Sequence, residues 1–214
     1  EHGVVHRDLK PDNIFLVRSS ESADVSVKLL DFGISKVFGS ERLTMTGQVL
    51  GTPRYMAPEQ LAAETNLDRR VDVYALGVLL FELLSRQRPY DVAGLTPAQS
   101  IRLVTEHEPA RLASVDPALR GDLDAICSKA LARDPERRYQ SVAELATDLQ
   151  RHLDRLPVTA RPPTGWYTFS RFVRRRAQLA VVVSLSLVLL LAGGIWHTIR
   201  AQRLINASIQ TLTG

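Results

Sequence analysis

The chain has 214 residues, of which 45% are hydrophobic and 23% are charged, values typical of a globular domain. Its net charge of +4 is unevenly distributed, because residues 1–160 carry 20 Lys and Arg against 23 Asp and Glu, whereas residues 161–214 carry 7 Arg and no acidic residue. This distribution argues against a nucleic-acid-binding domain, which spreads positive charge over a folded face, and the single cysteine, Cys127, excludes an intrachain disulfide.

The first predicted element is a β-hairpin. Apolar runs at 14–17 and 25–30 flank a polar loop, which is the pattern of two strands and a turn. Because a hairpin brings its two ends together, Asp8 and Asn13, just before the first strand, should lie near Asp31, just after the second. We therefore expect three oxygen-bearing side chains to converge, from the sequences HRDLKPDN at 6–13 and DFG at 31–33.

Several helices are predicted downstream. Residues 71–84 are apolar nearly all round, interrupted by Asp72 and Glu82, and predict a helix buried within the domain. Residues 95–108 also favour a helix. An amphipathic helix, in which Cys127 is a buried filler, follows from the spacing of Leu123, Ile126, Cys127, Ala130 and Leu131.

A last helix of the domain is predicted to begin with a capping box. Ser141 and Glu144 have the spacing in which each side chain bonds the backbone of the other. The apolar residues expected on one face of this helix are Val142, Leu145, Ala146, Leu149 and Leu153.

The tail contains a candidate membrane span. Residues 177–196 carry no charge and would extend about 30 Å as a helix, the thickness of a bilayer core. A buried core helix is the alternative, but this stretch is apolar on every face. Arginines concentrate before the span, at 171 and 174–176, which places residues 1–176 in the cytoplasm and 197–214 as a short extracytoplasmic segment. The prolines and glycine within 156–176 mark a juxtamembrane linker.

Five segments together resemble the protein kinase family, specifically bacterial serine/threonine kinases of the eukaryotic-like type. They are HRDLKPDN at 6–13, DFG at 31–33, GTPRYMAPEQ at 51–60, DVYALG at 72–77 and DPERRYQS at 134–141. The resemblance covers residues 1–155 and implies an α+β, mainly helical fold. We expect a kinase C-lobe, made of a small β-hairpin and a helical bundle, followed by the linker and a single transmembrane helix.

The resemblance also implies roles for individual residues. Asp8 would orient the attacking hydroxyl and accept its proton, and Lys10 would neutralise charge on the transferred phosphoryl group. Asn13 and Asp31 would hold Mg²⁺, with Mn²⁺ as the alternative ion. Phe15 matches the position that contacts the adenine of ATP.

Further residues would position this machinery. By the same resemblance, Asp72 would hold the backbone around His6 and Arg7. The spine that stacks in the active state of the family would include His6, Phe32 and Asp72.

Two more contacts are implied by the family pattern. Thr52 would bond Asp8 and Lys10. Glu59 would pair with Arg138 in a buried salt bridge that locks the C-lobe.

The segment between Asp31 and Glu59 resembles an activation segment. Thr44 and Thr46 match positions at which bacterial relatives autophosphorylate, and Arg7 would receive the phosphothreonine through charge-assisted bonds. The alternative is that both threonines are ordinary polar loop residues.

The implied function is a membrane-anchored serine/threonine protein kinase in signal transduction. Lys10 within HRDLKPDN, followed by GTPRY, resembles the serine/threonine pattern more than the tyrosine one. The expected partners are protein substrates, the membrane through 177–196 and, as an open point, a second copy joined through the span. No nucleic-acid partner is expected.

The chain begins at Glu1 and contains no glycine-rich phosphate loop and no strand-borne lysine for ATP. We therefore expect the C-terminal part of a longer kinase, which by itself would bind ATP poorly. The alternative function is a non-catalytic, membrane-tethered, pseudokinase-like binding module.

Overall fold

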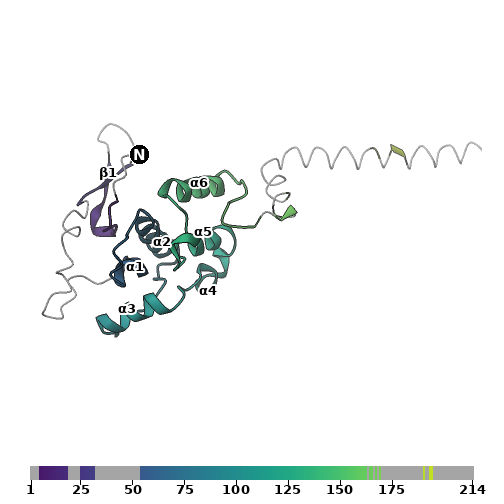
Figure 1. Ribbon diagram of the computed structural model, residues 1–214. Coiled ribbons are helices and arrows are strands. Elements are labelled where there is room, and N and C mark those ends of the chain that lie inside the picture. The colour runs from purple at the N-terminus through teal and green to yellow at the C-terminus, as the bar shows by residue number, and fades with distance from the viewer. Residues whose placement is uncertain are drawn as a thin grey trace, which may run out of the picture. The chain divides into compact units, whose positions relative to one another are not determined.

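The computed structural model describes residues 5–18, 25–31 and 54–162, and also residues 164, 165, 167, 169, 190, 193 and 194. The chain divides into two compact units, Glu1–Pro162 and Pro163–Gly214. The strands and helices named below lie in the first unit (Figure 1).

The predicted hairpin is confirmed. Strand β1 (Ile14–Arg18) pairs antiparallel with β2 (Val25–Leu29), and each strand end differs from the predicted one by a single residue. Ile14 lies opposite Leu29, and the Leu30 amide donates to the Asn13 carbonyl at 3.0 Å. A short 3₁₀ turn, η1 (Pro11–Asn13), leads into β1.

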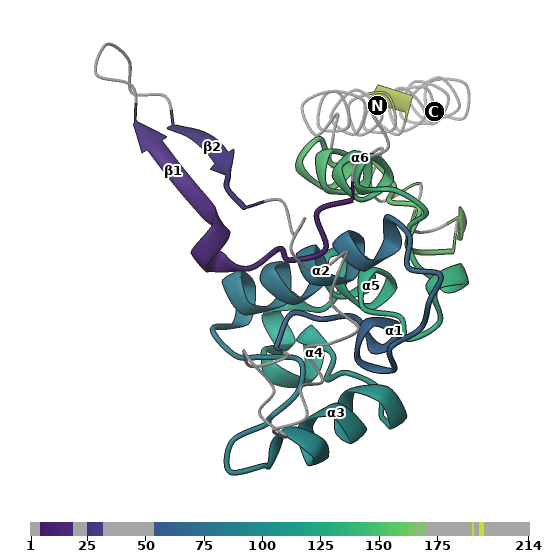
Figure 2. The same ribbon diagram turned by 60° about the vertical axis from the view of Figure 1, so that its left-hand side comes forward.

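The rest of the unit is helical and gathers around α2, which contacts α4, α5 and α6. In Figure 2 the hairpin stands apart from these helices. The elements in chain order are α1 (Pro58–Leu61), α2 (Arg70–Ser85), α3 (Pro97–Glu106), α4 (Leu112–Val115), η3 (Pro117–Leu119), α5 (Asp122–Ala130), η4 (Pro135–Arg137) and α6 (Val142–Leu153).

Helix α2 is the centre of the apolar core, as its sequence predicts. One side of it packs Tyr74, Val78 and Phe81 into a first cluster of buried residues. The other side places Val73 in a second cluster with residues of α5 and α6. Because both sides of α2 are covered, an all-round apolar sequence is what this position requires.

Helices α2 and α5 approach each other closely at Gly77. A Cβ built on Gly77 would lie 2.9 Å from the Cβ of Ala130 and 3.2 Å from two atoms of Leu131, closer than side-chain carbons normally come. Cys127 lies in the same interface, where it is buried as predicted and its thiol donates to the Gly77 carbonyl at 3.6 Å. The absence of a side chain at Gly77 therefore sets the spacing of the two helices.

The predicted capping box of α6 forms in part. The Ser141 hydroxyl accepts from the Glu144 amide at 3.2 Å, as expected for an N-cap. The Glu144 carboxylate, however, accepts from the amide of Gln140 at 2.9 Å, one residue before the cap. Both bonds of the capping motif are therefore present, but Glu144 bonds the amide of Gln140 instead of that of Ser141.

The buried face of α6 matches the predicted one only in part, because Leu145 is buried and Leu149 packs against the second core cluster. Val142 and Leu153 are 41% and 72% exposed, whereas the buried residues of the helix are Leu145 and Asp148. The helix is rotated toward Asp148 because that carboxylate receives hydrogen bonds from other parts of the fold. Apolar periodicity alone could not reveal a polar side chain at the centre of the packed face.

Residues 156–162, assigned from their prolines to the linker, belong to the folded unit in the structure. Val158 is buried in the second core cluster, and the amides of Thr159 and Ala160 bond Asp148. The lobe therefore extends beyond residue 155, because tertiary contacts hold a segment whose local sequence resembles a linker.

The predicted span at 177–196 lies outside the described residues, apart from Leu190, Gly193 and Gly194. Among the residues that the structure does describe, no helix combines the length and apolar character needed to cross a bilayer.

Candidate active site

The loop from His6 to Asn13 is fixed by a buried carboxylate of α2. Asp72 accepts from the His6 amide through Oδ2 and from the Arg7 amide through Oδ1, both at 2.8 Å. His6 is itself buried, and its Nε2 lies 3.2 Å from the Leu30 carbonyl at the end of the hairpin. The contact expected between Asp72 and this backbone is present, and it ties the loop to the core helix.

Two residues of this site adopt backbone conformations that are unusual for side chains other than glycine. Arg7 has φ +64° and Asp31 has φ +54°. Such conformations cost of order 1–3 kcal/mol and persist where the surrounding structure enforces them. For Arg7 the enforcing contact is the bond of its amide to Asp72. Strain of this kind concentrates at functional sites.

Asp8, Lys10 and Asn13 form a compact polar group. The Lys10 ammonium lies 3.1 Å from Asp8 Oδ2, and the Asn13 amide nitrogen donates to the Asp8 carbonyl at 2.8 Å. The same nitrogen lies 3.4 Å from Asp8 Oδ2. The Asp8 side chain keeps 22% of its surface exposed, so its carboxylate is positioned by the protein and still open to a substrate.

Asn13 and Asp31 have the chemistry of a small cation site. Because the amide nitrogen of Asn13 is turned toward Asp8, its Oδ1 is the atom available to a cation. The hairpin register brings Leu30 opposite Asn13, so Asp31 follows at the same end of the strands.

Mg²⁺ in phosphoryl-transfer sites is held by one or two such side chains together with phosphate oxygens. Among the described residues there is no cluster of three or more His, Cys, Asp or Glu that would form a full protein cage. Asn13 and Asp31 supply the amide and carboxylate oxygens that such a site uses.

The remaining predicted site residues fall into two groups. Phe15, on β1, is 48% exposed and so presents its ring at the surface of the hairpin. Phe32, Thr44, Thr46 and Thr52 lie outside the described residues.

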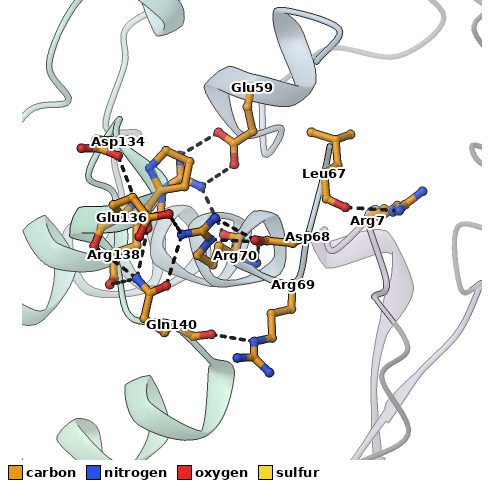
Figure 3. Close-up of polar contacts among 11 residues, drawn as sticks. Arg7, Glu59, Leu67, Asp68, Arg69, Arg70, Asp134, Glu136, Arg138 and Gln140 are labelled. Carbon is orange, nitrogen blue, oxygen red and sulfur yellow. Dashed lines mark hydrogen bonds and ion pairs between the residues drawn. The ribbon is translucent and has the colours of Figure 1, made fainter. Parts of the chain in front are cut away.

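The pair expected between Glu59 and Arg138 is present and buried. Two guanidinium nitrogens of Arg138 reach the two carboxylate oxygens of Glu59 at 2.6 and 2.7 Å, as Figure 3 shows. The Arg138 side chain is fully buried and also donates to three backbone carbonyls. This bidentate geometry joins α1 to the loop that follows η4.

Figure 3 also shows an exposed ion-pair network beside this buried one. Arg70 lies 2.8 Å from Asp68 and 2.6 Å from Glu136, which is 77% exposed. The Arg7 guanidinium donates to the Leu67 carbonyl at 3.4 Å, which places it at the edge of the site.

Sequence reasoning missed a contact that holds the segment after residues 51–53. The Tyr55 hydroxyl donates to Glu82 at 2.6 Å, and Arg88 lies 3.2 Å from the other oxygen of Glu82. Burial, together with the bond to Glu82, raises the pKa of Tyr55 to about 12. The signal was present, because Asp72 and Glu82 are the two acids that interrupt an otherwise apolar helix, and each holds a loop.

A second missed contact involves Gln60. Its side-chain nitrogen donates to the Arg7 carbonyl at 3.2 Å, while its oxygen accepts from the Ala57 amide at 2.9 Å. Gln60 therefore connects the start of α1 to the loop that carries Asp8. Gln60 ends the segment GTPRYMAPEQ, but that pattern does not show which backbone groups its side chain bonds.

Residues 1–152 match the family described as "Protein kinase domain". The chain is 39% identical over 165 residues to a probable serine/threonine-protein kinase of Streptomyces coelicolor, covering 76% of this chain and 23% of that protein. It is 44% identical over 151 residues to the serine/threonine-protein kinase Pkn1 of Myxococcus xanthus, covering 69% and 21%.

The chain is also 38% identical over 153 residues to the serine/threonine-protein kinase PknB of Mycobacterium tuberculosis, covering 71% and 23%. In each case the matched part spans less than a quarter of the relative. The family match takes in both the loop at 6–13 and the buried Glu59–Arg138 pair, and the chain belongs to the protein kinase domain family.

Proposed function

We propose that this protein is a membrane-anchored serine/threonine protein kinase that transfers the γ-phosphoryl group of ATP to Ser and Thr hydroxyls of protein substrates. The observation that carries this proposal is the Asp8 carboxylate, held between Lys10 and Asn13 on a loop that Asp72 fixes to the core. The names of the relatives support the same reaction.

In this mechanism Asp8 orients the substrate hydroxyl and accepts its proton. The carboxylate is suited to this because Lys10 contacts Oδ2 and part of the side chain remains exposed. The Lys10 ammonium, which contacts Asp8, would offset negative charge on the transferred group. The protein contributes positioning and electrostatics, and its own groups form no covalent bond to phosphorus.

Asn13 and Asp31 would hold Mg²⁺, or Mn²⁺ in its place, through Oδ1 and a carboxylate oxygen. When bound, the ion with ATP supplies charge neutralisation at the phosphates. Phe15, whose ring is half-exposed, would contact the adenine. These residues together orient the nucleotide toward Asp8.

Regulation would come from the activation segment. Thr44 and Thr46 are the proposed phosphorylation sites, and Arg7 is the proposed receiver of the phosphate. Its guanidinium makes one long bond, to the Leu67 carbonyl, among the described residues, so it could turn to a phosphate at small cost. Mass spectrometry of the active protein with neither threonine phosphorylated would contradict this part of the proposal.

The membrane anchor would be residues 177–196, with the kinase domain in the cytoplasm. The uncharged length of the segment and the arginines that precede it support this orientation. Deletion of 177–196 should move the protein from the membrane to the supernatant fraction. Retention in the membrane fraction after the deletion would contradict the anchor.

The test of the reaction is phosphate transfer from labelled ATP to a basic protein, measured with the full-length protein. Asp8→Asn should lower the rate by about 10²–10⁴-fold. The matched control is Asp12→Asn, which changes an exposed carboxylate of the same loop and should leave the rate within about twofold.

Equal rates for the wild type and Asp8→Asn would overturn the assignment of Asp8. Absence of transfer by the wild-type protein would instead favour a non-catalytic binding module.

A further inference from the structure

Residues 157–162, called the clasp here, lie beyond the matched family region, which ends at residue 152. They contain no helix or strand, yet their polar groups converge on two buried carboxylates of the lobe. The chain continues from the clasp directly into residues 163–214. The clasp is therefore the covalent connection between the lobe and the tail.

The first buried carboxylate is Asp148 of α6, which is fully buried. Its Oδ1 accepts from the Thr159 amide at 2.7 Å, and its Oδ2 accepts from the Thr159 hydroxyl at 2.8 Å and the Ala160 amide at 2.9 Å. The Tyr139 hydroxyl donates to the same Oδ2 at 2.8 Å.

Burial alone would raise the pKa of Asp148, but the hydrogen bonds from Thr159, Tyr139 and Ala160 leave it below its ordinary value. Asp148 is therefore an ionised receptor, and three of its four donors belong to the clasp.

The second carboxylate is Asp122 at the start of α5, whose side chain is 1% exposed. The Arg161 guanidinium donates to its Oδ1 at 3.0 Å, and His152 Nδ1 lies 3.5 Å from its Oδ2. The clasp thus bonds α6 through Asp148 and α5 through Asp122.

Between these polar contacts the clasp completes the apolar core. Val158 is 3% exposed and belongs to the second cluster, together with Val73 of α2. Val73 follows Asp72, the residue that holds the amides of His6 and Arg7. The second core cluster and the peptide bond between Val73 and Asp72 therefore connect the clasp to the backbone of the loop at residues 6–13.

We propose that the clasp is a releasable regulatory element: when closed it supports the loop at residues 6–13, and when displaced it loosens that loop. Its structure suits release, because it is held by side-chain receptors instead of a backbone ladder, and Thr159 is exposed. The inference concerns the folded lobe and stands independently of the proposed reaction, since its main readout is hydrogen exchange.

The test uses amide hydrogen exchange on the full chain with two clasp variants. Asp148→Asn places an amide donor among four donors, and Arg161→Gln removes the charged contact to Asp122. The matched controls are Asp154→Asn, an exposed aspartate just after α6, and Arg155→Gln, an exposed arginine whose side chain bonds no described residue. Arg161→Gln keeps the experiment decisive if Asp148→Asn fails to fold.

We expect both clasp variants to speed exchange of the Thr159 and Ala160 amides by about tenfold or more. They should also speed exchange at His6 and Arg7 severalfold, while the Val104 amide of α3 and both control variants remain unchanged.

Faster exchange at Thr159 and Ala160 with unchanged exchange at His6 and Arg7 would overturn the proposal, because the clasp would then be a passive cap. An equal change at Val104 would overturn it as well, since that pattern reports general destabilisation. Wild-type clasp amides that exchange at the rate of an unfolded peptide would show that the clasp is not closed.

Discussion

The hairpin and the helical part of the lobe differ in how far their apolar side chains are buried. In β1 and β2 every residue is exposed or half-exposed, and large apolar side chains such as Leu16 and Val27 keep 70% and 62% of their surface open. In α2, by contrast, Val73 and Phe81 are completely buried. Yet both regions contribute to one site, since Asp31 follows the hairpin and Asp72 lies in α2.

The difference shows where the site obtains its rigidity. The loop with Asp8 is held by Asp72, Gln60 and the core behind them. The hairpin adds Asn13 and Asp31 through a two-stranded ladder, and such a ladder is marginal by itself. Changes on the helical side should therefore cost stability, and changes on the hairpin should leave it almost untouched.

The largest expected effect comes from breaking the buried pair of Glu59 and Arg138. Glu59→Ala leaves the Arg138 charge buried without its partner and should lower the free energy of unfolding by about 3–5 kcal/mol. The control is Glu136→Ala, because Glu136 pairs with Arg70 at the same 2.6 Å but is 77% exposed, and it should cost about 0–1 kcal/mol. Urea denaturation of both variants measures the contrast. Equal losses would mean that burial does not govern these pairs.

The next effect tests the support of the loop at residues 6–13. Asp72→Ala leaves the amides of His6 and Arg7 without their buried acceptor and should cost about 2–3 kcal/mol. It should also accelerate hydrogen exchange at these two amides. The control Asp68→Ala removes a half-exposed carboxylate and should cost less than about 1 kcal/mol. Unchanged exchange at His6 and Arg7 in Asp72→Ala would show that another contact fixes the loop.

A smaller loss is expected where α2 meets α5. Gly77→Ala gains about 1 kcal/mol in helix propensity, but its Cβ would lie 2.9 Å from Ala130. Overpacking costs about 1–3 kcal/mol, so a net loss of about 1 kcal/mol should appear in thermal or urea unfolding. Leu83→Ala, on the exposed face of α2, should change stability by less than about 0.5 kcal/mol. A stabilised Gly77→Ala would mean that the two helices can separate freely.

These contrasts also show which parts of the fold could be predicted from the sequence. The hairpin and α2 were predictable, because strand alternation between turn residues and an all-round apolar helix are local patterns. The place of Asp148 on the packed face of α6 was not, because it depends on donors that reach the carboxylate from residues 139, 159 and 160.

In the candidate site, spacing was enough to bring Asp8 and Asn13 together. The bond between Tyr55 and Glu82 joins residues 27 positions apart and follows only from tertiary packing.

The pH dependence of stability should reveal Asp148. Its pKa in the folded protein lies below the ordinary value of 3.8, so the folded state favours the ionised form. The stabilisation is complete above that value and is lost as the pH falls through the lower, folded-state pKa. Each unit of pKa shift corresponds to about 1.4 kcal/mol. We would measure urea unfolding between about pH 2 and 6, the range in which carboxyl groups titrate. The free energy of unfolding should fall less steeply toward low pH in Asp148→Asn than in the wild type. Identical pH profiles would contradict this role of Asp148.

The smallest effect should come from the hairpin itself. Leu16 and Val27 lie directly opposite each other in the register and both are largely exposed, so Leu16→Lys with Val27→Glu introduces a favourable cross-strand charge pair. We expect unfolding free energy to change by less than about 0.5 kcal/mol, and self-association measured by sedimentation to fall, because an exposed apolar face is removed. A loss above about 1 kcal/mol in the full-length protein would show that another part of it covers this face. The hairpin would then take its rigidity from that cover, and its exposure would no longer distinguish it from α2.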